Sequence, residues 1–252
     1  MYFESHAHYD DKKFNNDREE ILNLLPKNNI DYVINVGCDM ESSIKSIELA
    51  EKYEYIYASI GFHPHNAKNI KENDIKKLID LSNHKKVVAI GEIGLDFHYN
   101  HSPKDIQKYW FKRQLEIVKK INKPVIIHSR EASQECFDIL KNSNIKHGVI
   151  HCYSGSTEMA KEYIKLGFYI GIGGVLTFSN AKKLIEVIKN IQLEQILIET
   201  DSPYLSPIPN RGQRNDSRNL KYIVETIANI KNTTPENVAN ITKLNAKQLF
   251  FK

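Results

Sequence analysis

The sequence of 252 residues has few cysteines and no long apolar run, and these absences exclude several classes of protein. Its three cysteines, Cys38, Cys136 and Cys152, cannot all pair within one chain. We therefore expect reduced thiols, which argues against a small secreted fold held together by disulfides. No apolar stretch approaches the roughly 20 residues of a membrane-spanning helix, and no basic segment followed by an apolar one begins the chain. These absences indicate a soluble, cytoplasmic protein that has no contact with a membrane.

Glycine-rich motifs and flexible linkers are also missing. No stretch rich in proline, glycine or serine divides the chain, so we expect a single domain over residues 1–252. No Gly-x-Gly-x-x-Gly pattern follows the first apolar run, which argues against a dinucleotide-binding sheet. The net charge of +4 is small for this length and by itself does not indicate a nucleic-acid-binding surface. No feature of the sequence indicates an obligate protein partner.

What the sequence does contain is a regular alternation of short apolar runs and helix-like segments. The runs are rich in β-branched residues and nearly continuous in hydrophobicity, which is typical of strands buried on both faces of a parallel sheet. They cover residues 2–8, 32–38, 56–62, 87–95, 125–128, 149–153, 168–172 and 196–200. Eight such runs in about 250 residues predict an α/β fold of the (β/α)8 TIM barrel type. A doubly wound open sheet is the structural alternative.

Helix signals lie between these runs. The segment 102–105, Ser-Pro-Lys-Asp, predicts a capped helix start with Pro103 in the first helical position. The segment 234–236, Thr-Pro-Glu, predicts the start of the last helix in the same way. Trp110 lies within the first of these helices, where we expect it to pack against the core instead of stacking on a base.

Five of the apolar runs end in imidazoles or carboxylates. Alternate side chains of an extended strand share a face, so His6 and His8 point the same way and can chelate a divalent cation. In a parallel barrel the carboxyl ends of all strands meet on one face, where the active site lies. The predicted metal ligands on this face are His6, His8, Glu92, His128, His151 and Asp201.

The number of these ligands indicates two metals. One catalytic zinc uses three protein ligands and a water, whereas six ligands suit two divalent metal ions (Mg²⁺, Mn²⁺ or Zn²⁺) joined by a bridging carboxylate. Two-metal sites lower the pKa of a bound water and stabilise both the attacking and the leaving oxygen in a displacement at phosphorus. The predicted chemistry is therefore hydrolysis. Each residue alone also has a structural interpretation, since strand-end histidines are commonly hydrogen-bonded and Asp201 before Pro203 can initiate a turn.

Six short blocks, in order along nearly the whole chain, resemble a known family. They are His6-Ala7-His8, Gly61-Phe62-His63-Pro64-His65, Gly91-Glu92-Ile93-Gly94-Leu95-Asp96, His128-Ser129-Arg130, His151-Cys152-Tyr153-Ser154-Gly155 and Glu199-Thr200-Asp201-Ser202-Pro203-Tyr204-Leu205. Together they are similar to the signature blocks of the TatD-type metal-dependent deoxyribonucleases, which belong to the amidohydrolase-like barrels. The resemblance implies a divalent-metal phosphodiesterase that acts on DNA, often from the 3′ end.

The resemblance also implies how the ligands divide between the metals. One metal would be held by His6, His8, Glu92 and Asp201, and the second by Glu92, His128 and His151. Glu92 would then be the bridge between them. The sequence departs from the family at Asp96-Phe97-His98-Tyr99, where many relatives have tyrosine directly after the aspartate. This departure affects the expected substrate rim and leaves the metal ligands unchanged.

The mechanistic hypothesis is hydrolysis of a DNA phosphodiester, as in a 3′–5′ exonuclease, by a two-metal-activated hydroxide. Asp201 and Glu92 are the predicted catalytic residues, and Asp201 is the candidate acceptor of the water's proton. His63 and His65 are assigned to orienting the substrate phosphate, with structural caps beside Pro64 as the alternative.

Arginines near the predicted site have two interpretations each. Arg130, two residues after His128, either binds the substrate phosphate or holds a ligand carboxylate. Arg211 and Arg214 either contact a nucleic-acid backbone or belong to a solvated loop. The alternative function is hydrolysis of small esters, lactones, amides or aminoacyl-tRNA, because related barrels change substrates through their loops. A non-catalytic binding protein is a third possibility, which the intact set of ligands opposes.

Overall fold

The structure is a computed structural model that describes residues 1–251. Eight parallel strands lie in one sheet in the order in which they occur along the chain. They are β1 (Tyr2–Ala7), β2 (Ile30–Val36), β3 (Ile56–Ile60), β4 (Val87–Asp96), β5 (Val125–Arg130), β6 (Gly148–Ile150), β7 (Phe168–Ile172) and β8 (Ile196–Ile198). Each strand overlaps one predicted apolar run, and their side chains are almost all buried because helices cover the outer face.

The sheet closes on itself, which distinguishes a barrel from an open sheet. Ala7, at the end of β1, pairs with Ser202, beyond the end of β8, in an isolated parallel bridge. The hydroxyl of Ser5 also donates a hydrogen bond of 2.9 Å to the carbonyl oxygen of Ile198. The predicted (β/α)8 TIM barrel is therefore confirmed.

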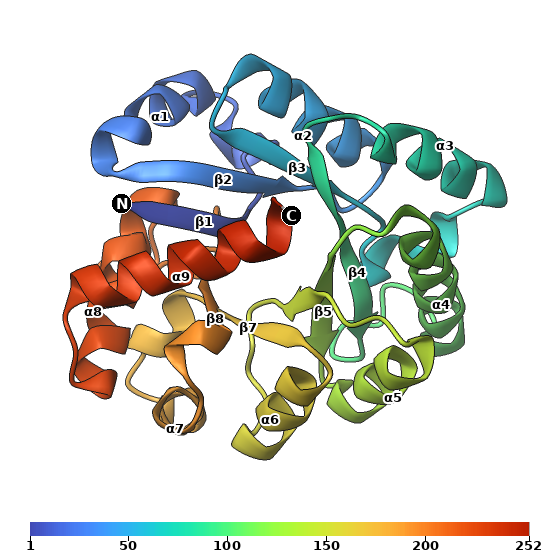
Figure 1. The fold of residues 1–252 in the computed structure, drawn as a ribbon. Helices are drawn as coiled ribbons and strands as arrows, with labels where there is room; N and C mark the ends of the chain where they lie inside the picture. The colour runs from blue at the N-terminus through green and yellow to red at the C-terminus, as the bar shows by residue number, and fades with distance from the viewer. Residues whose placement is uncertain (252) are drawn as a thin grey trace.

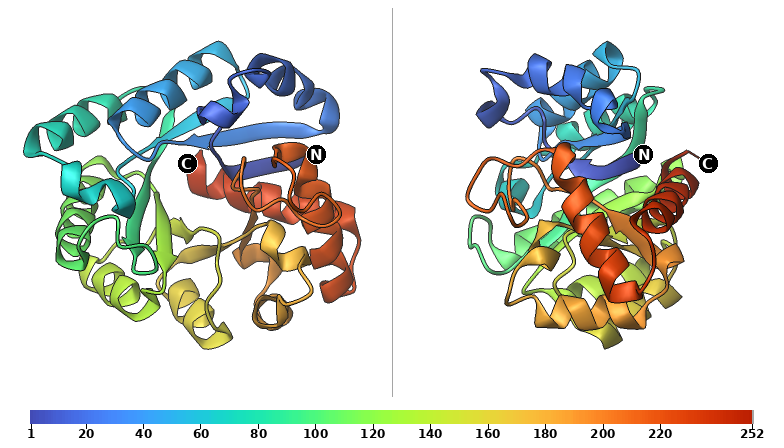
Figure 2. Two further views of the ribbon diagram at one scale, coloured as in Figure 1. Left: turned by 180° about the vertical axis from the view of Figure 1, so that it is seen from behind. Right: turned by 90° about the vertical axis from the view of Figure 1, so that its left-hand side faces the viewer.

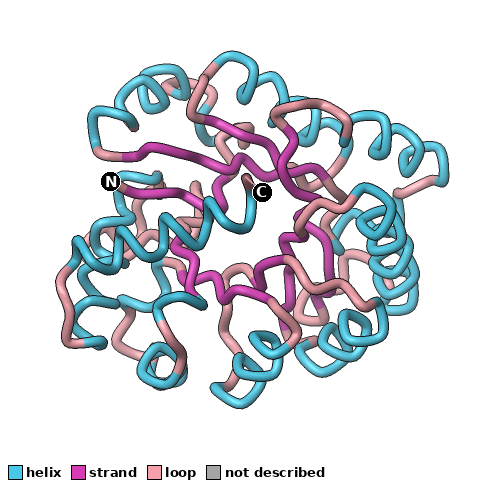
Figure 3. Tube along the Cα trace, viewed as in Figure 1, coloured by secondary structure: helices cyan, strands magenta, loops and turns pink. Residues whose placement is uncertain are grey.

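Helices surround the ring of strands (Figure 1), and the tube in Figure 3 separates the inner strands from the outer helices. The helices are α1 (Arg18–Leu24), α2 (Met40–Lys52), α3 (Glu72–Ser82), α4 (Lys104–Ile121), α5 (Ser133–Ser143), α6 (Thr157–Lys165), α7 (Lys182–Asn190), α8 (Leu220–Lys231) and α9 (Pro235–Phe250). Six short 3₁₀ segments add to these within residues 1–251. None of the helices in this part of the chain combines the length and the apolar character needed to cross a bilayer.

The predicted helix starts agree with the structure in one case and differ in the other. Thr234 caps α9, with Pro235 in its first turn, as predicted. In α4, Pro103 occupies the N-cap position instead of the first helical position. Ser102 does not cap this helix, because its hydroxyl donates to the carbonyl oxygen of His65 (2.8 Å). Trp110 is buried on α4, as expected for a packing residue.

Strand β6 is shorter than its predicted run and ends at Ile150. Cys152 therefore lies in a turn, in the left-handed region with φ of 45°, and is half-buried. The apolar run predicted over residues 149–153 therefore extends three residues past the observed strand. The three cysteines are all free, in agreement with the expected reduced thiols.

The two ends of the barrel differ in chemistry. Aromatic side chains pack at the amino ends of the strands. The ring centroid of Phe3 lies 5.2 Å from that of Tyr32 and 5.9 Å from that of Phe250, and the ring centroids of Phe251 and Tyr57 are 4.6 Å apart. In the right-hand view of Figure 2, helix α9 (red) lies on this side and the loop after β8 (orange) lies on the opposite side. The aromatic packing closes the amino end of the barrel, whereas the polar residues that follow the strands gather at the carboxyl end.

Candidate active site

The six predicted metal ligands come together at the carboxyl ends of the strands. They come from β1 and the residue that follows it (His6, His8), from β4 (Glu92) and β5 (His128), and from the turns after β6 (His151) and β8 (Asp201). Between 0 and 16% of each of these side chains is exposed to solvent. A buried group of four imidazoles and two carboxylates requires a cation or mutual pairing to compensate its charge.

Glu92 divides this group into two sets, because each of its carboxylate oxygens faces a different set. Oε2 lies 3.5 Å from His6 Nε2 and 3.8 Å from His8 Nε2. Asp201 completes this first set, with its Oδ1 3.7 Å from His6 Nε2 and 3.4 Å from His8 Nε2. The two imidazole nitrogens themselves are 3.1 Å apart. Four donor atoms therefore surround one small volume.

The second set surrounds the other oxygen of Glu92. Oε1 lies 2.7 Å from His128 Nδ1 and 2.7 Å from His151 Nε2, and these two nitrogens are 3.3 Å apart. His63 Nε2 also approaches Oε1, at 3.5 Å. One carboxylate therefore lies between two groups of nitrogen donors, which is the arrangement expected of a bridging ligand.

In two of the imidazoles, the outer ring nitrogen, which points away from Glu92, lies beside an oxygen acceptor, and this arrangement suits metal binding. His8 Nδ1 lies 2.7 Å from the carbonyl oxygen of Val36, and His128 Nε2 lies 3.0 Å from Asp96 Oδ2. When the outer nitrogen donates its hydrogen to such an acceptor, the inner nitrogen presents a lone pair to the site. The donor set therefore fits divalent cations that accept imidazole and carboxylate ligands.

The imidazoles keep both carboxylates ionised. Burial raises the pKa of Glu92, but the charge of His151 and the hydrogen bond from His128 outweigh it and hold this pKa well below its ordinary value. Burial also raises the pKa of Asp201, while the hydrogen bond from His8 has the opposite effect and leaves the pKa below the ordinary value. Both groups are therefore carboxylates at neutral pH, as ligands and proton acceptors need to be.

Asp201 acts both as a turn residue and as a member of the site. Its backbone lies in the left-handed region, with φ of 54°. Its N–H donates to the carbonyl oxygen of His6 (3.0 Å), and its own carbonyl oxygen accepts from the N–H of Tyr204 (2.9 Å). Aspartate tolerates this conformation better than a β-branched residue. The turn predicted from the sequence is the element that places the carboxylate beside His8.

The residues predicted to orient a phosphate lie at different depths. His63 is buried within the second ligand set, and its ring centroid lies 4.5 Å from that of His128. The side chain of His65 is 30% exposed and its Nε2 lies 2.9 Å from Asp96 Oδ2. His63 Nδ1 also accepts from the N–H of His65 (3.1 Å), so both the cap and the site interpretations have support.

Arg130 lies at the rim, over the face of an aromatic ring. Its guanidinium is 4.7 Å from the ring centroid of Tyr99, which is 42% exposed. Within residues 1–251 Arg130 forms no ion pair with a ligand carboxylate. The contacts therefore give no support to the interpretation that Arg130 holds a ligand carboxylate in place. Arg214 instead pairs with Asp17 (2.8 Å), and Arg211 lies over the ring of Phe178 at 4.3 Å. These two arginines are engaged with the protein itself.

Reasoning from the sequence assigned no role to three other carboxylates around the site. Asp96 accepts hydrogen bonds from both His65 and His128. Glu199 lies beside His151, and Glu4, which is fully buried, accepts from the N–H and hydroxyl of Thr200. Burial raises the pKa of Glu4 to about 8. Each of the three carboxylates follows or interrupts an apolar run, and this position was the signal in the sequence that could have indicated a role at the site. Their partners could not be identified in this way, because they are distant in sequence.

Comparisons with known proteins agree on one family. A family model described as TatD related DNase matches residues 3–251. The protein named uncharacterized metal-dependent hydrolase YabD of Bacillus subtilis strain 168 is 44% identical over 252 residues, which cover 99% of each chain. The similarly named YcfH of Escherichia coli K12 is 31% identical over 98% of this chain and 94% of its own.

Solved structures extend this similarity to the fold. YJJV, a TatD homolog from Escherichia coli K12, superimposes with a TM-score of 0.94 at 28% identity, covering 100% of this chain and 98% of its own. An organophosphorus hydrolase variant from Deinococcus radiodurans reaches a TM-score of 0.69 at 12% identity, over 99% of this chain and 92% of its own. The second likeness concerns the barrel alone.

Proposed function

The chain belongs to the family of TatD-related DNases and is a metal-dependent hydrolase; on this premise, we propose that it hydrolyses phosphodiester bonds of DNA with two divalent metal ions. The observation that carries the proposal is the position of Glu92 between two sets of donors, with one carboxylate oxygen toward each. Four imidazoles and two carboxylates exceed what a single catalytic zinc needs, and they suit a two-metal site.

The proposed ligands follow the two sets. His6, His8, Asp201 and Glu92 Oε2 would hold one ion, and His128, His151 and Glu92 Oε1 the other. When bound, the ions supply Lewis acidity that activates water for attack and neutralises negative charge on a phosphate. The remaining contributions come from the side chains of the protein.

Asp201 is the proposed proton acceptor. It is ionised at neutral pH, and 16% of its side chain is exposed, more than Glu92 at 4%. Its Oδ1 faces His6 and His8, so its second oxygen remains free to accept a proton from water at the edge of the site. Because Glu92 is enclosed by imidazoles, it suits the bridging role better than proton transfer.

The rim beside this centre supports a nucleic-acid substrate. Arg130 and the exposed ring of Tyr99 stack together, and His65 lies 5.6 Å from the Tyr99 ring centroid. A guanidinium binds a phosphate through several N–H groups, while an aromatic face stacks on a nucleobase. We propose that this rim binds the nucleotide next to the scissile phosphate, with His63 nearer the reacting group.

End-labelled single-stranded and double-stranded DNA, incubated with Mg²⁺, Mn²⁺ or Zn²⁺, tests the proposal beside a panel of esters, lactones and amides. We expect metal-dependent shortening of labelled DNA, and its loss in the Glu92→Gln variant. Robust ester turnover together with intact DNA under every metal would instead assign the site to the alternative class of substrate.

A further inference from the structure

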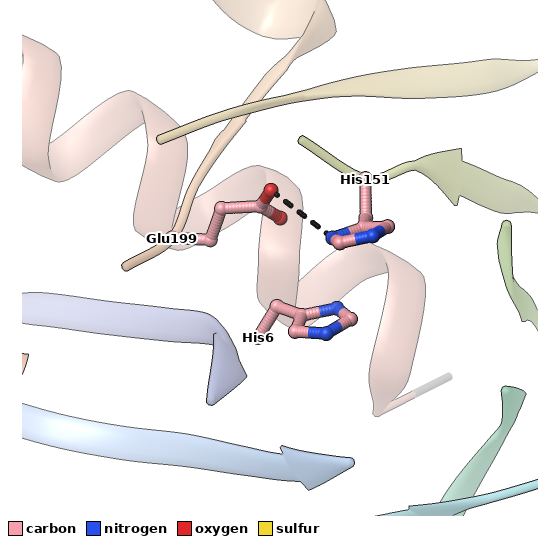
Figure 4. Close-up of side chains that lie close together, drawn as sticks. All are labelled: His6, His151 and Glu199. Carbon is pink, nitrogen blue, oxygen red and sulfur yellow. Dashed lines mark ion pairs between the residues drawn. The ribbon is translucent and has the colours of Figure 1, made fainter. Parts of the chain in front are cut away.

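Three buried polar atoms beside the proposed metal centre have no hydrogen-bond partner in the described part of the chain. They are Nδ1 of His6, Nδ1 of His151 and Oε2 of Glu199. Figure 4 shows the three side chains facing one another, with the two imidazole rings stacked. The ring centroids are 4.0 Å apart and the ring planes differ by 15°. Unpaired buried polar atoms are costly, so such a group within a site calls for a function.

The group resembles a third metal site only in its composition. One ligand atom from each of His6, His151 and Glu199 lies within 4.8 Å of the others. However, both imidazoles already direct Nε2 toward Glu92, at 3.5 Å from His6 and 2.7 Å from His151. A neutral imidazole that binds a metal through Nε2 carries its hydrogen on Nδ1 and has no lone pair there. Two N–H donors and one carboxylate form a hydrogen-bonding group, not a cation site.

The other two ligand histidines already have outer acceptors, Val36 O for His8 and Asp96 for His128. We propose that Glu199 is the shared positioning carboxylate of His6 and His151, one ligand from each of the two proposed metal sets. His151 Nδ1 lies 3.5 Å from Glu199 Oε1 and needs only a small shift to donate directly. One buried water that joins His6 Nδ1 to Oε2 completes the group. The inference rests on the proposed two-metal site.

The surrounding backbone holds Glu199 in this position. The N–H of Cys152 donates to Oε1, which leaves Oε2 available to other donors. On β7, a Cβ at Gly171 would lie 2.7 Å from Oε2 and 3.0 Å from the Cα atom of His151. Glycine at this position therefore leaves the space that Oε2 occupies. The Gly171→Ala change would displace the carboxylate without removing its charge.

The test compares Glu199→Gln with Glu4→Gln in the full-length protein. Both replace a fully buried glutamate near the site, but Glu4 contacts Thr200 and the backbone N–H of His6, not a ligand ring. Titration with Mn²⁺ and Zn²⁺ against a competing chelator measures the affinity of each metal equivalent. We expect about 10-fold to 100-fold weaker binding of both equivalents in Glu199→Gln and unchanged binding in Glu4→Gln.

Histidine ¹H–¹⁵N spectra of the Zn²⁺-loaded protein provide a readout that a purely structural role would not change selectively. We expect Glu199→Gln to shift the Nδ1–H signals of His6 and His151 while those of His8 and His128 stay in place. Wild-type metal affinity with unchanged spectra would overturn the inference, and so would a third equivalent of metal bound by the wild type.

A second variant keeps the test decisive if Glu199→Gln does not fold. Gly171→Ala retains the carboxylate, but its Cβ would also lie 3.0 Å from the Cα atom of His151. Weaker binding of both metals therefore supports the role of Glu199, whereas wild-type binding, or weaker binding of the second metal alone, contradicts it. Circular dichroism of the metal-free variants establishes folding beforehand. The result is also separable from the nuclease proposal, because a protein that binds two metals through this network but leaves DNA intact would refute only the proposed substrate.

Discussion

Replacing Glu92 with glutamine neutralises the side chain whose two oxygens face the two proposed metal sets. The change keeps the size of the side chain but removes the negative charge between the two groups of donors. We therefore expect both metals to be lost together. A residue that served only one set would instead leave one equivalent bound.

The loss of folding stability that Glu92→Gln causes in the metal-free protein follows from two hydrogen bonds. Glu92 Oε1 lies 2.7 Å from both His128 Nδ1 and His151 Nε2. A charge-assisted hydrogen bond contributes about 1.5–3 kcal/mol, roughly twice a neutral one, so the two together lose about 1.5–3 kcal/mol on conversion to the amide. A domain is stable by about 5–15 kcal/mol, so the barrel of the variant stays folded.

The effect on the metal-bound protein is distinct from this loss. Each ion at 100 times its Kd stabilises the folded state by about 2.7 kcal/mol, so two ions contribute about 5.4 kcal/mol, which corresponds to about 11–22 °C in Tm for a chain of this size. We expect the wild type to show this metal-induced shift and Glu92→Gln to show none. Cleavage of labelled DNA should fall by about 100-fold to 1000-fold, as for other losses of preorganised charge stabilisation.

Differential scanning fluorimetry with and without metal, beside the cleavage assay, measures both effects, and Glu4→Gln serves as the control. That variant should keep the metal-induced shift and the activity, because Glu4 contacts no ligand ring. A Glu92→Gln protein with wild-type turnover and an undiminished metal-induced shift would refute the bridging role.

Three further predictions concern the metals, the rim and a buried acid. Chelation of both ions should lower the Tm of the wild type by about 11–22 °C, and an unchanged melting curve after elemental analysis confirms metal loss would count against an occupied site. Tyr99→Ala should raise KM for single-stranded DNA by about 5-fold to 150-fold, the equivalent of 1–3 kcal/mol of stacking, while Tyr99→Phe retains the wild-type value; equal KM values for all three proteins would exclude stacking. The pKa of Glu4 is about 8 in the folded protein against an ordinary 4.5, so the stability that its neutral form provides is fully present below pH 4.5 and is lost as the pH rises to 8. In urea unfolding of the chelated protein, the free energy of unfolding of the wild type should therefore fall by about 4 kcal/mol more than that of Glu4→Gln over this range, and parallel pH profiles would disprove the shift.

The barrel could be predicted from the sequence because its signals are local. Buried parallel strands are short, continuous apolar runs, and each of the eight runs overlaps an observed strand. Errors are confined to boundaries, where local signals compete with tertiary contacts. Ser102 had the residue type of a helix cap, but its hydroxyl bonds to the carbonyl oxygen of His65, so Pro103 takes the cap position.

The residue types of the candidate site were also predictable, since the barrel topology sends every carboxyl strand end to one face. His6 and His8 on β1, and Glu92 on β4, needed only strand periodicity and strand order to be placed together. The family resemblance, confirmed by the match over residues 3–251, supplied the division into two sets. The roles of these residues as ligands stay predictions that metal titration can test.

Only the tertiary structure decided how these side chains meet. Sequence spacing does not determine which imidazole nitrogen faces inward, because that depends on acceptors such as Val36 and Asp96, which lie on other strands. It also does not reveal that His63 lies within the second set, or that Glu199 faces two histidines far away in the chain. Strand identity follows from hydrophobic periodicity, which is local. Hydrogen-bond partnership depends on distances of about 3 Å between residues on different strands, and only the closed barrel fixes those distances.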